Sequence, residues 1–563
     1  MKVHENLTSE QSLYNFRVWV ALMIFCFEIF LVHVPLRIPA FYPRWSSSFR
    51  KLSLTRTTLD LNYSTGPVLG AIVLLSTTTI SWEQLVSGIT GDEHGIQPLN
   101  VMILIYSLAY VCVSLDHTGV FSYSALVVVT KCGKSGTRLF IGFFFLTVFI
   151  GALASNDVVI LTLSPLICYL SQALSIDPWS FLIAEFVAAN TSSMALYVGN
   201  PTNVVVSMAY DISFLKYSQL FTFPFLGAVL VQLSLLLFVY WKDIPKVIQV
   251  VEADPRAALV RPQAAIFGGL ALFLCIAALV VSSLWHISVW KVTLPFALLV
   301  AAFDLVEDVM SIKTRRSHEN KTQFKICSIS NTVKEKVYAQ SFQNHSVSEE
   351  MKATSLSFCS LPSPPKPVHF QLSVKPAVKT LDELNTNHLN CLTSYCPNFT
   401  AVLLGLPWGI LPFLLGMFVG VKAIQIMGWT QRLASGLVVL FPSSPIVWYL
   451  GIGLISSLLC GLLNNLPAAI LLAQTLTLID FSDNPSAGDG AVLGLIAACN
   501  LGALLTPAGS LAGLMWRDIL LKKNLNPTFK VLWKTIAIIF PLTLLSALLF
   551  LIIQAQVFDA NLI

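Results

Sequence analysis

The 563-residue chain is 55% hydrophobic, has a mean hydropathy of +0.74, and carries Asp, Glu, Lys or Arg at only 11% of its positions. Soluble domains carry these residues at about a quarter of their positions, so the composition excludes an ordinary soluble fold. The net charge of +5 does not indicate nucleic-acid binding, because the cations lie mostly in loops between apolar runs. In the loops of a membrane protein, the positions of Lys and Arg indicate which side of the membrane each loop occupies.

Apolar segments recur along the chain, and several approach the roughly 20 residues that span a bilayer core. The first segment has no small-residue cleavage pattern behind it, which favours a retained helix over a cleaved signal peptide. We predict membrane elements at residues 16–36, 65–81, 100–130, 139–173, 178–208, 217–241, 263–284, 288–304, 403–427, 447–478, 489–518 and 534–555.

Between residues 304 and 398 the apolar pattern gives way to Lys, Arg, Ser, Asn and the Pro-rich stretch SLPSPPKPV. This composition predicts a disordered loop. Lys and Arg are retained on the cytoplasmic side of a membrane, and they place this loop and the loop after the first element inside. The charge assignments agree with one another only if residues 139–173 and 447–478 are re-entrant hairpins, entering from the cytoplasm and from outside respectively.

With these two hairpins, the halves of the chain repeat one order of elements in opposite orientations: helix, helix, hairpin, broken helix, helix. Such inverted repeats are typical of transporters. The predicted fold class is therefore an all-α polytopic membrane protein with two inverted repeats. Its predicted parts are an N-terminal helix and cytoplasmic loop (1–64), a first repeat (65–241), a linking loop and helix (242–287), and a second repeat (288–303 and 399–563) divided by the 304–398 loop.

Each half carries two polar breaks at matching intervals. In the first half SNDVVILTLSPLI and VAANTSSMALYVGNPTNVVV interrupt apolar runs, and in the second half GLLNNLPAAILL and AACNLGALLTPAGSLAGLMW do so. Asn190 follows Asn156 by 34 residues, and Asn500 follows Asn465 by 35. Polar groups at membrane depth are costly, and unwound helix ends there present dipoles to a cavity. These breaks predict a site for a small oxygen-rich solute and a coupling cation.

The substrate- and ion-binding residues that we predict come from all four breaks. For any single Ser or Thr among them, helix packing is the alternative role. The predicted residues are Ser155, Asn156, Asp157, Asn190, Thr191, Ser192, Gly199, Asn200, Thr202, Asn203, Asn464, Asn465, Asn500, Thr506, Gly509 and Ser510.

Two carboxylates are candidates for proton coupling. Asp157, at a hairpin tip, is suited to exchange a proton or bind Na⁺, and the alternative is an interfacial residue or the partner of an Arg. Glu185 lies about one helical turn before Asn190 and is the second candidate, with a buried structural hydrogen bond as its alternative. Glu28, Asp116 and His117 have weaker cases.

Cysteines and catalytic motifs add little. The 11 cysteines show no metal-ligand spacing. Cys460 and Cys499 precede the second-half asparagines closely, which raises a thiol site for a soft solute. Against that site stand the need for release and the lack of a third thiol nearby in sequence. The spans contain no HExxH, G-x-S-x-G or paired-Asp arrangement, so we expect no enzyme, no cofactor and no metal site.

The stretch NLGALLTPAGSLAGLMWRDILLKKNL at residues 500–525 resembles the late signature of the arsenite/antimonite permease family of the ion transporter superfamily. SNDVVILTLSPLI, GNPTNVV and NNLPAAILL are similar to that family's other polar breaks, so the resemblance covers both halves apart from the N-terminus and the 304–398 loop. It implies two hairpins inside a scaffold, alternating access, and export of arsenite or antimonite in exchange for protons, which confers arsenical resistance.

Such a resemblance predicts the fold better than the substrate, because relatives with similar breaks transport Na⁺ and H⁺, dicarboxylates or silicic acid. None of the four breaks contains Lys or Arg, which favours a neutral polyol such as As(OH)₃ or silicic acid. We therefore predict a secondary active exporter of arsenite or antimonite coupled to protons. The alternatives are a Na⁺/H⁺ antiporter and a silicic acid or dicarboxylate transporter.

The expected setting follows from these predictions. We expect a multi-pass protein of the plasma membrane whose partners are the lipid bilayer, the solute and H⁺, with Na⁺ left open and no nucleic acid. A homodimer is also left open. The 304–398 insertion departs from the compact family pattern and argues against pairing with a soluble ATPase subunit.

Overall fold

The structure is a computed structural model that describes residues 2–45, 52–91, 96–248, 254–285, 287–311, 396–441 and 444–558. It has two compact units, Met1–Val300 with Gly405–Ile563, and Ala301–Leu404. Most of the predicted loop at 304–398, namely residues 312–395, lies outside the described residues. Its two described ends are helical, because one span runs from Val289 to Ser311 and α14 begins at Pro397.

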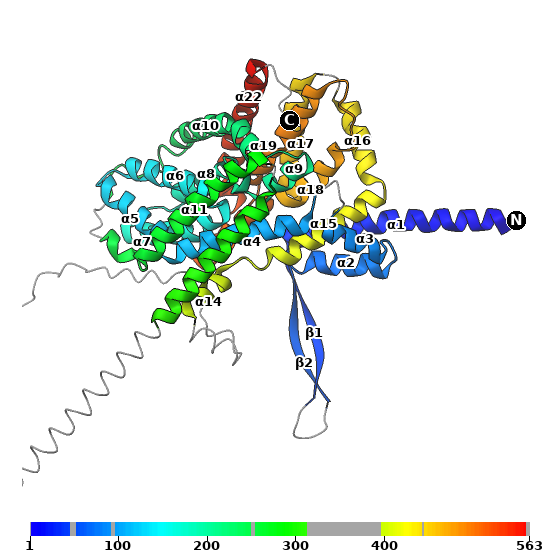
Figure 1. Cartoon of the computed structure of the whole chain (residues 1–563), viewed down its shortest axis with the longest axis horizontal. Helices are drawn as coiled ribbons and strands as arrows, with labels where there is room; N and C mark the ends of the chain where they lie inside the picture. Colours follow the sequence, from blue (N-terminus) through cyan, green and yellow to red (C-terminus); the bar gives the residue numbers. More distant parts are fainter. Residues whose placement is uncertain are drawn as a thin grey trace, which may run out of the picture. The chain divides into compact units, whose positions relative to one another are not determined.

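The chain begins with α1 (Lys2–His33), which leads into an antiparallel pair of strands, β1 (Leu36–Trp45) and β2 (Leu52–Leu61) (Figure 1). This hairpin lies where the sequence analysis expects a loop. The β2 sequence LSLTRTTLDL is rich in Thr, which favours strands, and contains no run of apolar residues, so a search for apolar runs passes over it. It is the one sheet among the described residues.

The remaining described elements are helices. The first half contains α2 (Gly66–Ser76), α3 (Trp82–Thr90), α4 (Pro98–His117), α5 (Val120–Cys132), α6 (Gly136–Leu153), α7 (Asn156–Leu174), α8 (Trp179–Ser192), η1 (Tyr197–Gly199), α9 (Pro201–Ala209) and α10 (Phe214–Val239). Next come η2 (Pro255–Ala258), α11 (Pro262–Ser282) and η3 (Ser283–Trp285). The second half contains α14 (Pro397–Gly405), α15 (Ile410–Ile426), α16 (Trp429–Leu440), α17 (Pro445–Leu463), α18 (Asn465–Leu476), α19 (Pro485–Leu501), η5 (Gly502–Leu504), η6 (Pro507–Gly509), α20 (Leu511–Lys522), α21 (Phe529–Lys534), the π-turn η7 (Thr535–Ile539) and α22 (Phe540–Phe558).

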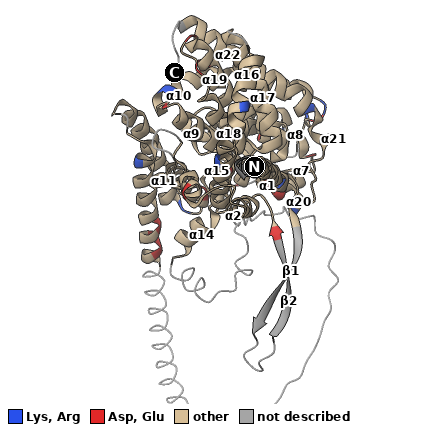
Figure 2. Cartoon of the chain, turned by 90° about the vertical axis from the view of Figure 1, so that its right-hand side faces the viewer, with Lys and Arg blue, Asp and Glu red and all other residues tan. Residues whose placement is uncertain are grey.

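Eleven spans in the described part of the chain are long and apolar enough to cross a membrane. Large apolar side chains also point outward, among them Phe238 (81% exposed) and Val439 (84% exposed), as expected for surfaces that face lipid. Charged residues are sparse over the described helices (Figure 2). The predicted all-α, multi-pass membrane class is thus confirmed.

The two halves share an order of elements. Each has a long helix that stops at a left-handed glycine, Gly119 (φ 85°) after α4 and Gly428 (φ 76°) after α15, where a short helix starts. Glycine adopts this conformation without steric cost. The single element expected at 100–130 is therefore two helices, α4 and α5, because Gly119 ends the first of them.

Each predicted hairpin is a pair of helices with a short break. α6 and α7 are separated at Ala154–Ser155, and α17 and α18 at Asn464. α6, α7 and α17 have 18, 19 and 19 residues, enough to cross a membrane, whereas α18 has 12. The re-entrant course of the two pairs, and with it the opposite orientation of the repeats, stays a prediction.

The broken helices form the interior. In the most apolar stretch of the span Pro485–Leu504, 94% of the residues are buried. Every residue of α8 from Ser180 to Ser192 is also buried. α9 packs against α18 and α19, while α8 packs against α6, α7 and α19, and these elements lie side by side in Figure 1. The fold therefore brings the polar breaks of both halves together inside the protein.

Candidate functional site

Two asparagines at equivalent places in the halves are held in the same way. Asn190 lies in the last turn of α8 and its Nδ2 donates to the Phe186 carbonyl at 2.8 Å. Asn500 lies in the last turn of α19 and its Nδ2 donates to the Ile496 carbonyl at 2.9 Å. Each amide is thus fixed by a carbonyl one turn earlier, and each directs its Oδ1 away from its own helix.

Both of these oxygens accept hydrogen bonds from the opposite half of the chain. Ser510 Oγ donates to Asn190 Oδ1 at 3.2 Å, and Asn200 Nδ2 donates to Asn500 Oδ1 at 3.0 Å. Ser510 follows Asn500 by the same interval at which Asn200 follows Asn190. The contacts are therefore reciprocal: each half supplies one acceptor and one donor to the other. We call these four side chains the reciprocal pair.

The two donors also cap the helices that restart after the breaks. Asn200 is the N-cap of α9, where its side chain accepts from Thr202 N at 3.2 Å. Ser510 is the N-cap of α20 and accepts from Gly513 N at 3.0 Å. N-capping satisfies amide groups that a helix start leaves open, so the reciprocal pair fixes both helix starts against the other half.

Two further side chains complete this buried network. Asn500 Nδ2 donates to Asn203 Oδ1 at 2.7 Å, and Ser193 Oγ donates to Asn500 Oδ1 at 2.8 Å. Asn203 Nδ2 in turn donates to the Ser193 carbonyl at 2.8 Å. Ser193 is absent from the predicted set, although it belongs to the NTSS stretch from which Thr191 and Ser192 were selected.

Thr191 and Ser192 contact scaffold helices instead. Thr191 Oγ1 accepts from Gln232 Nε2 of α10 at 2.7 Å. Ser192 Oγ donates to the Ala189 carbonyl at 2.9 Å and lies against Gly151 of α6. These contacts are those of helix packing, the alternative role given to single Ser and Thr residues.

The tip of the second hairpin is tied to the second broken helix. Asn464 Nδ2 donates to the Ala508 carbonyl at 2.8 Å, and Thr506 Oγ1 donates to the Gly461 carbonyl at 3.0 Å. Asn464 has φ 76° and ψ 148°, a region that non-glycine residues seldom adopt and that clusters at functional sites. Asn465 Nδ2 donates to the Cys499 carbonyl at 3.1 Å, one residue before Asn500.

The tip of the first hairpin is less completely bonded. Asn156 Nδ2 lies 3.5 Å from Asn190 Oδ1, and Asn156 Oδ1 has no hydrogen-bond partner among the described residues. The buried Thr202 hydroxyl likewise has none within the described part of the chain. Buried polar atoms are normally paired with protein or water, so these two are open to a bound molecule.

The two predicted glycines allow close backbone contacts. A Cβ at Gly199 would lie 2.5 Å from the Ser193 carbonyl oxygen, and one at Gly509 would lie 3.1 Å from the Ala503 carbonyl oxygen. Gly199 therefore needs a residue without a side chain, whereas a Cβ at Gly509 would require only a small shift of its neighbour.

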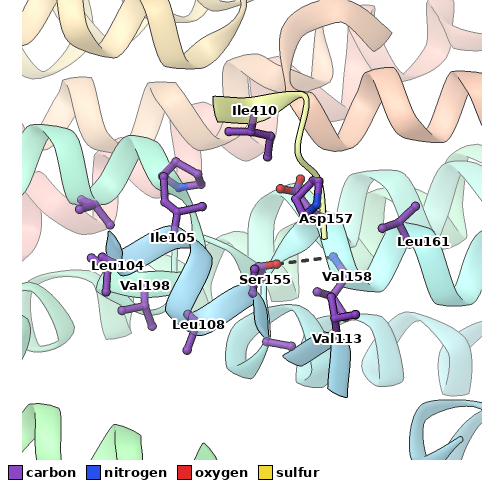
Figure 3. Close-up of a pocket in the computed structure, with 15 residues that line it drawn as sticks. Leu104, Ile105, Leu108, Val113, Ser155, Asp157, Val158, Leu161, Val198 and Ile410 are labelled. Atoms are coloured by element: carbon purple, nitrogen blue, oxygen red, sulfur yellow. Dashed lines mark hydrogen bonds between the residues drawn. The ribbon is translucent and has the colours of Figure 1, made fainter. Parts of the chain in front are cut away.

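A cavity of about 50 Å³ adjoins the first hairpin tip (Figure 3). A buried water needs roughly 10–15 Å³ on this scale, so the space suits a solute of a few heavy atoms. Of the predicted residues, Ser155 and Asp157 line it, while the reciprocal pair lies outside the lining. The lining consists of Leu104, Ile105, Leu108, Ala109, Val113, Ala154, Ser155, Asp157, Val158, Leu161, Val198, Pro201, Val204, Pro407 and Ile410.

Asp157 is the one ionisable residue in this lining. It occupies the first turn of α7 and is half-buried, and no described residue donates a hydrogen bond to its carboxylate. Ser155 Oγ, also in the lining, accepts from Val158 N at 3.5 Å and so caps α7 (Figure 3). A carboxylate at a helix N-terminus is favoured by the helix dipole while remaining free to bind a proton or a solute.

Glu185 lies away from the cavity. It is 1% exposed, and its Oε1 accepts from Ser164 Oγ of α7 at 2.8 Å. Its Oε2 has no hydrogen-bond partner in the described ranges. Glu185 therefore joins the second arm of the first hairpin to the broken helix α8.

Two carboxylates outside the predicted set also occupy membrane helices. Asp116 at the end of α4 accepts from Thr162 Oγ1 of α7 at 2.9 Å. Glu28 of α1 is fully buried against Gly70 of α2 and Gly420 of α15, and neither of its oxygens is hydrogen-bonded to a described residue. Their position inside apolar runs was the available signal, but sequence alone does not show these partners.

Both halves of the chain resemble known protein families. A family model described as a citrate transporter matches residues 54–314, and one described as an arsenical pump membrane protein matches residues 394–555. The arsenical pump membrane protein of Escherichia coli K12 is 23% identical over 489 residues, which cover 83% of this chain and 94% of that protein. The arsenical pump membrane protein of Yersinia enterocolitica is 22% identical over 459 residues, which cover 80% of this chain and 86% of that protein. The solved YdaH transporter of Alcanivorax borkumensis aligns over 98% of this chain and 99% of its own, with a TM-score of 0.46 and 13% identity.

The apolar spans and the family matches together define a multi-pass membrane transporter. The two family models match the two halves, and the arsenical pump relatives match most of the chain's length, so the comparisons support an ArsB-like ion transporter family. This is a family of transporters and not a class of enzymes. The resemblance found in the polar breaks is thereby confirmed.

Proposed function

We propose that this protein exports arsenite or antimonite across the plasma membrane in exchange for protons, and that Asp157 carries the exchanged proton. The observation that supports this most directly is the cavity at the first hairpin tip. Its one ionisable group is a carboxylate with no hydrogen-bond donor among the described residues. Intramembrane carboxylates of this kind typically serve proton or ion pathways.

The chemistry of the cavity favours a small neutral polyol. Its lining contains no Lys or Arg to pair with a carboxylate solute. As(OH)₃ is uncharged and offers hydroxyl groups that donate to a carboxylate and accept from a hydroxyl. Asn156 Oδ1 and the Thr202 hydroxyl, both unpaired, are adjacent in sequence to the lining residues Ser155, Asp157 and Pro201, and would supply further contacts.

Exchange then follows from competition at Asp157. The ionised carboxylate accepts hydrogen bonds from solute hydroxyls, whereas protonation removes an acceptor and weakens solute binding. Proton and solute therefore exclude each other, and such negative coupling between two ligands is reciprocal. A carrier that changes access with either ligand bound, but not when empty, is an antiporter.

The reciprocal pair has a different role in this proposal. Its members are buried and bonded to one another across the two halves, so they hold the broken helices together. Relative movement of the hairpins against this centre would open the cavity to one side at a time, as in transporters built from internal repeats.

The test is flux through the purified full chain in liposomes loaded with arsenite. An inward proton gradient should drive arsenite out, and collapsing the gradient with a protonophore should stop it. Antimonite should behave in the same way, whereas citrate should not. Silicic acid efflux without arsenite efflux would show that silicic acid is the substrate. Sodium-driven proton movement without any metalloid flux would overturn the proposal and indicate Na⁺/H⁺ antiport. Liposomes without protein provide the background.

A further inference from the structure

Two cysteines from different helices of the second half meet beside its broken helix. Cys460 lies in the last turn of α17, and Cys499 lies in the last turn of α19, one residue before Asn500. Both are 0% exposed, and their side chains lie close enough to interact with each other. They are 39 positions apart in the sequence, and the fold brings together the two thiols that the sequence raised as a possible site.

The backbone around the two thiols is closely packed. A Cβ at Gly502, just after α19, would lie 2.6 Å from the Ser457 Cα and 3.1 Å from the Cys460 Cβ, so only glycine permits this approach. Asn465 Nδ2 donates to the Cys499 carbonyl at 3.1 Å. The separation of the thiols is therefore set by packed helices and by the tip of the second hairpin.

Two adjacent thiols are a chelating donor set for a soft trivalent centre. In the reaction 2 R–SH + As(OH)₃ → (R–S)₂As–OH + 2 H₂O, two As–O bonds break and two As–S bonds form. The thiol protons leave with the displaced hydroxyl groups as water, and no atom is oxidised or reduced. The arsenic keeps one hydroxyl, so two thiols from the protein are sufficient.

A polar group is available for that remaining hydroxyl. Ser456 precedes Cys460 by one helical turn and therefore lies on the same side of α17. It is 0% exposed, and its hydroxyl has no hydrogen-bond partner among the described residues. Zinc would need four ligands, and the described residues contain no group of three or more His, Cys, Asp and Glu that could hold a metal ion.

We propose that Cys460 and Cys499 form a chelating site for trivalent arsenic or antimony, distinct from the cavity that Asp157 lines. The inference rests on the proposed function for its ligand. Because the thiols belong to α17 and α19, the bound element would link the first arm of the second hairpin to the broken helix. Both thiols are buried, so loading requires the opening movement of transport.

The experiment uses the purified full chain in lipid nanodiscs, incubated with sodium arsenite and freed of unbound arsenite by gel filtration. We expect one retained arsenic per chain, with an arsenic K-edge absorption spectrum that shows two sulfur neighbours and one oxygen. Dimercaptopropanol should strip the arsenic, whereas mercaptoethanol should not. Cys460→Ser and Cys499→Ser should each reduce retention to the level of empty nanodiscs, and Cys168→Ser, at a buried cysteine of α7, should retain the wild-type amount.

Arsenic with only oxygen neighbours in the wild type, or full retention by Cys460→Ser, would overturn the dithiol site. The spectrum of the wild type decides the matter even if a serine variant fails to fold. Proton-driven arsenite flux without As–S bonds contradicts this site alone. As–S bonds without proton-driven flux contradict the proposed function alone.

Discussion

Replacing Asn500 by alanine tests whether the reciprocal pair holds the two halves together. The change removes the acceptor of Ser193 Oγ and Asn200 Nδ2 and the donor to Asn203 Oδ1. Ser193 keeps its second bond, to the Asn190 carbonyl at 2.7 Å, so the Asn200 amide and the Asn203 oxygen lose most.

The expected loss can be bounded from these contacts. Interhelical hydrogen bonds in membrane proteins average ~0.6 kcal/mol, so the loss of three costs about 2 kcal/mol. Two buried groups left without good partners cost about 1–3 kcal/mol each, which sets the upper end near 6 kcal/mol. We expect Asn500→Ala to lower the free energy of unfolding by about 2–6 kcal/mol.

The assay is equilibrium unfolding by SDS in mixed micelles, followed by tryptophan fluorescence. Trp516 of α20, one of the chain's 12 tryptophans, is fully buried and stacks on Phe186 of α8 with ring centroids 4.8 Å apart, so its share of the signal reports the contact between the halves. Asn526→Ala, at an exposed position beyond α20, is the matched control and should change stability by less than about 0.5 kcal/mol. An Asn500→Ala loss as small as that of the control would refute the reasoning.

Three further substitutions probe the packing around the site. Gly70→Ala would drive a Cβ into the Glu28 carboxylate, so we expect a loss of about 1–3 kcal/mol that Glu28→Ala in the same chain partly recovers; additive losses would contradict the contact. Asn464→Ala should be less stable than Asn464→Gly by about 1–2 kcal/mol, because both lose the amide and only alanine keeps a Cβ at φ 76°; equal stabilities would argue against that backbone. Gly502→Ala should reduce expression and thermal stability, since its Cβ would lie 2.6 Å from the Ser457 Cα and no side-chain rotation relieves this; wild-type thermal stability would show that α17 can move away.

Much of the fold could be predicted because its signals are local. Apolar length determined the membrane class, and the asparagines of the first breaks coincide with helix starts, Asn156 with α7 and Asn465 with α18. The matching intervals to Asn190 and Asn500 identified the helix ends because each interval lies within one half. The β1–β2 hairpin was missed since its strands contain no long apolar run.

The contacts within the site could not be predicted because they join distant parts of the chain. Ser510 and Asn190 are 320 residues apart, and Asn200 and Asn500 are 300 apart. Composition likewise does not reveal that Pro407, from the second half, lines the cavity beside Asp157. Local polarity identified candidate residues, while tertiary packing decided which of them meet.

Asp157 is central to the account, and proton-driven arsenite export by Asp157→Asn in liposomes tests it most directly. The substitution is nearly isosteric, so the cavity should be kept while the proton carrier is lost. We predict that proton-driven flux falls by about tenfold or more, because the amide carries no exchangeable proton and, like the protonated acid, lacks one acceptor for the solute. Asp116→Asn, which can still accept from Thr162, is the matched control and should export like the wild type. Unchanged proton-driven export by Asp157→Asn would contradict the account.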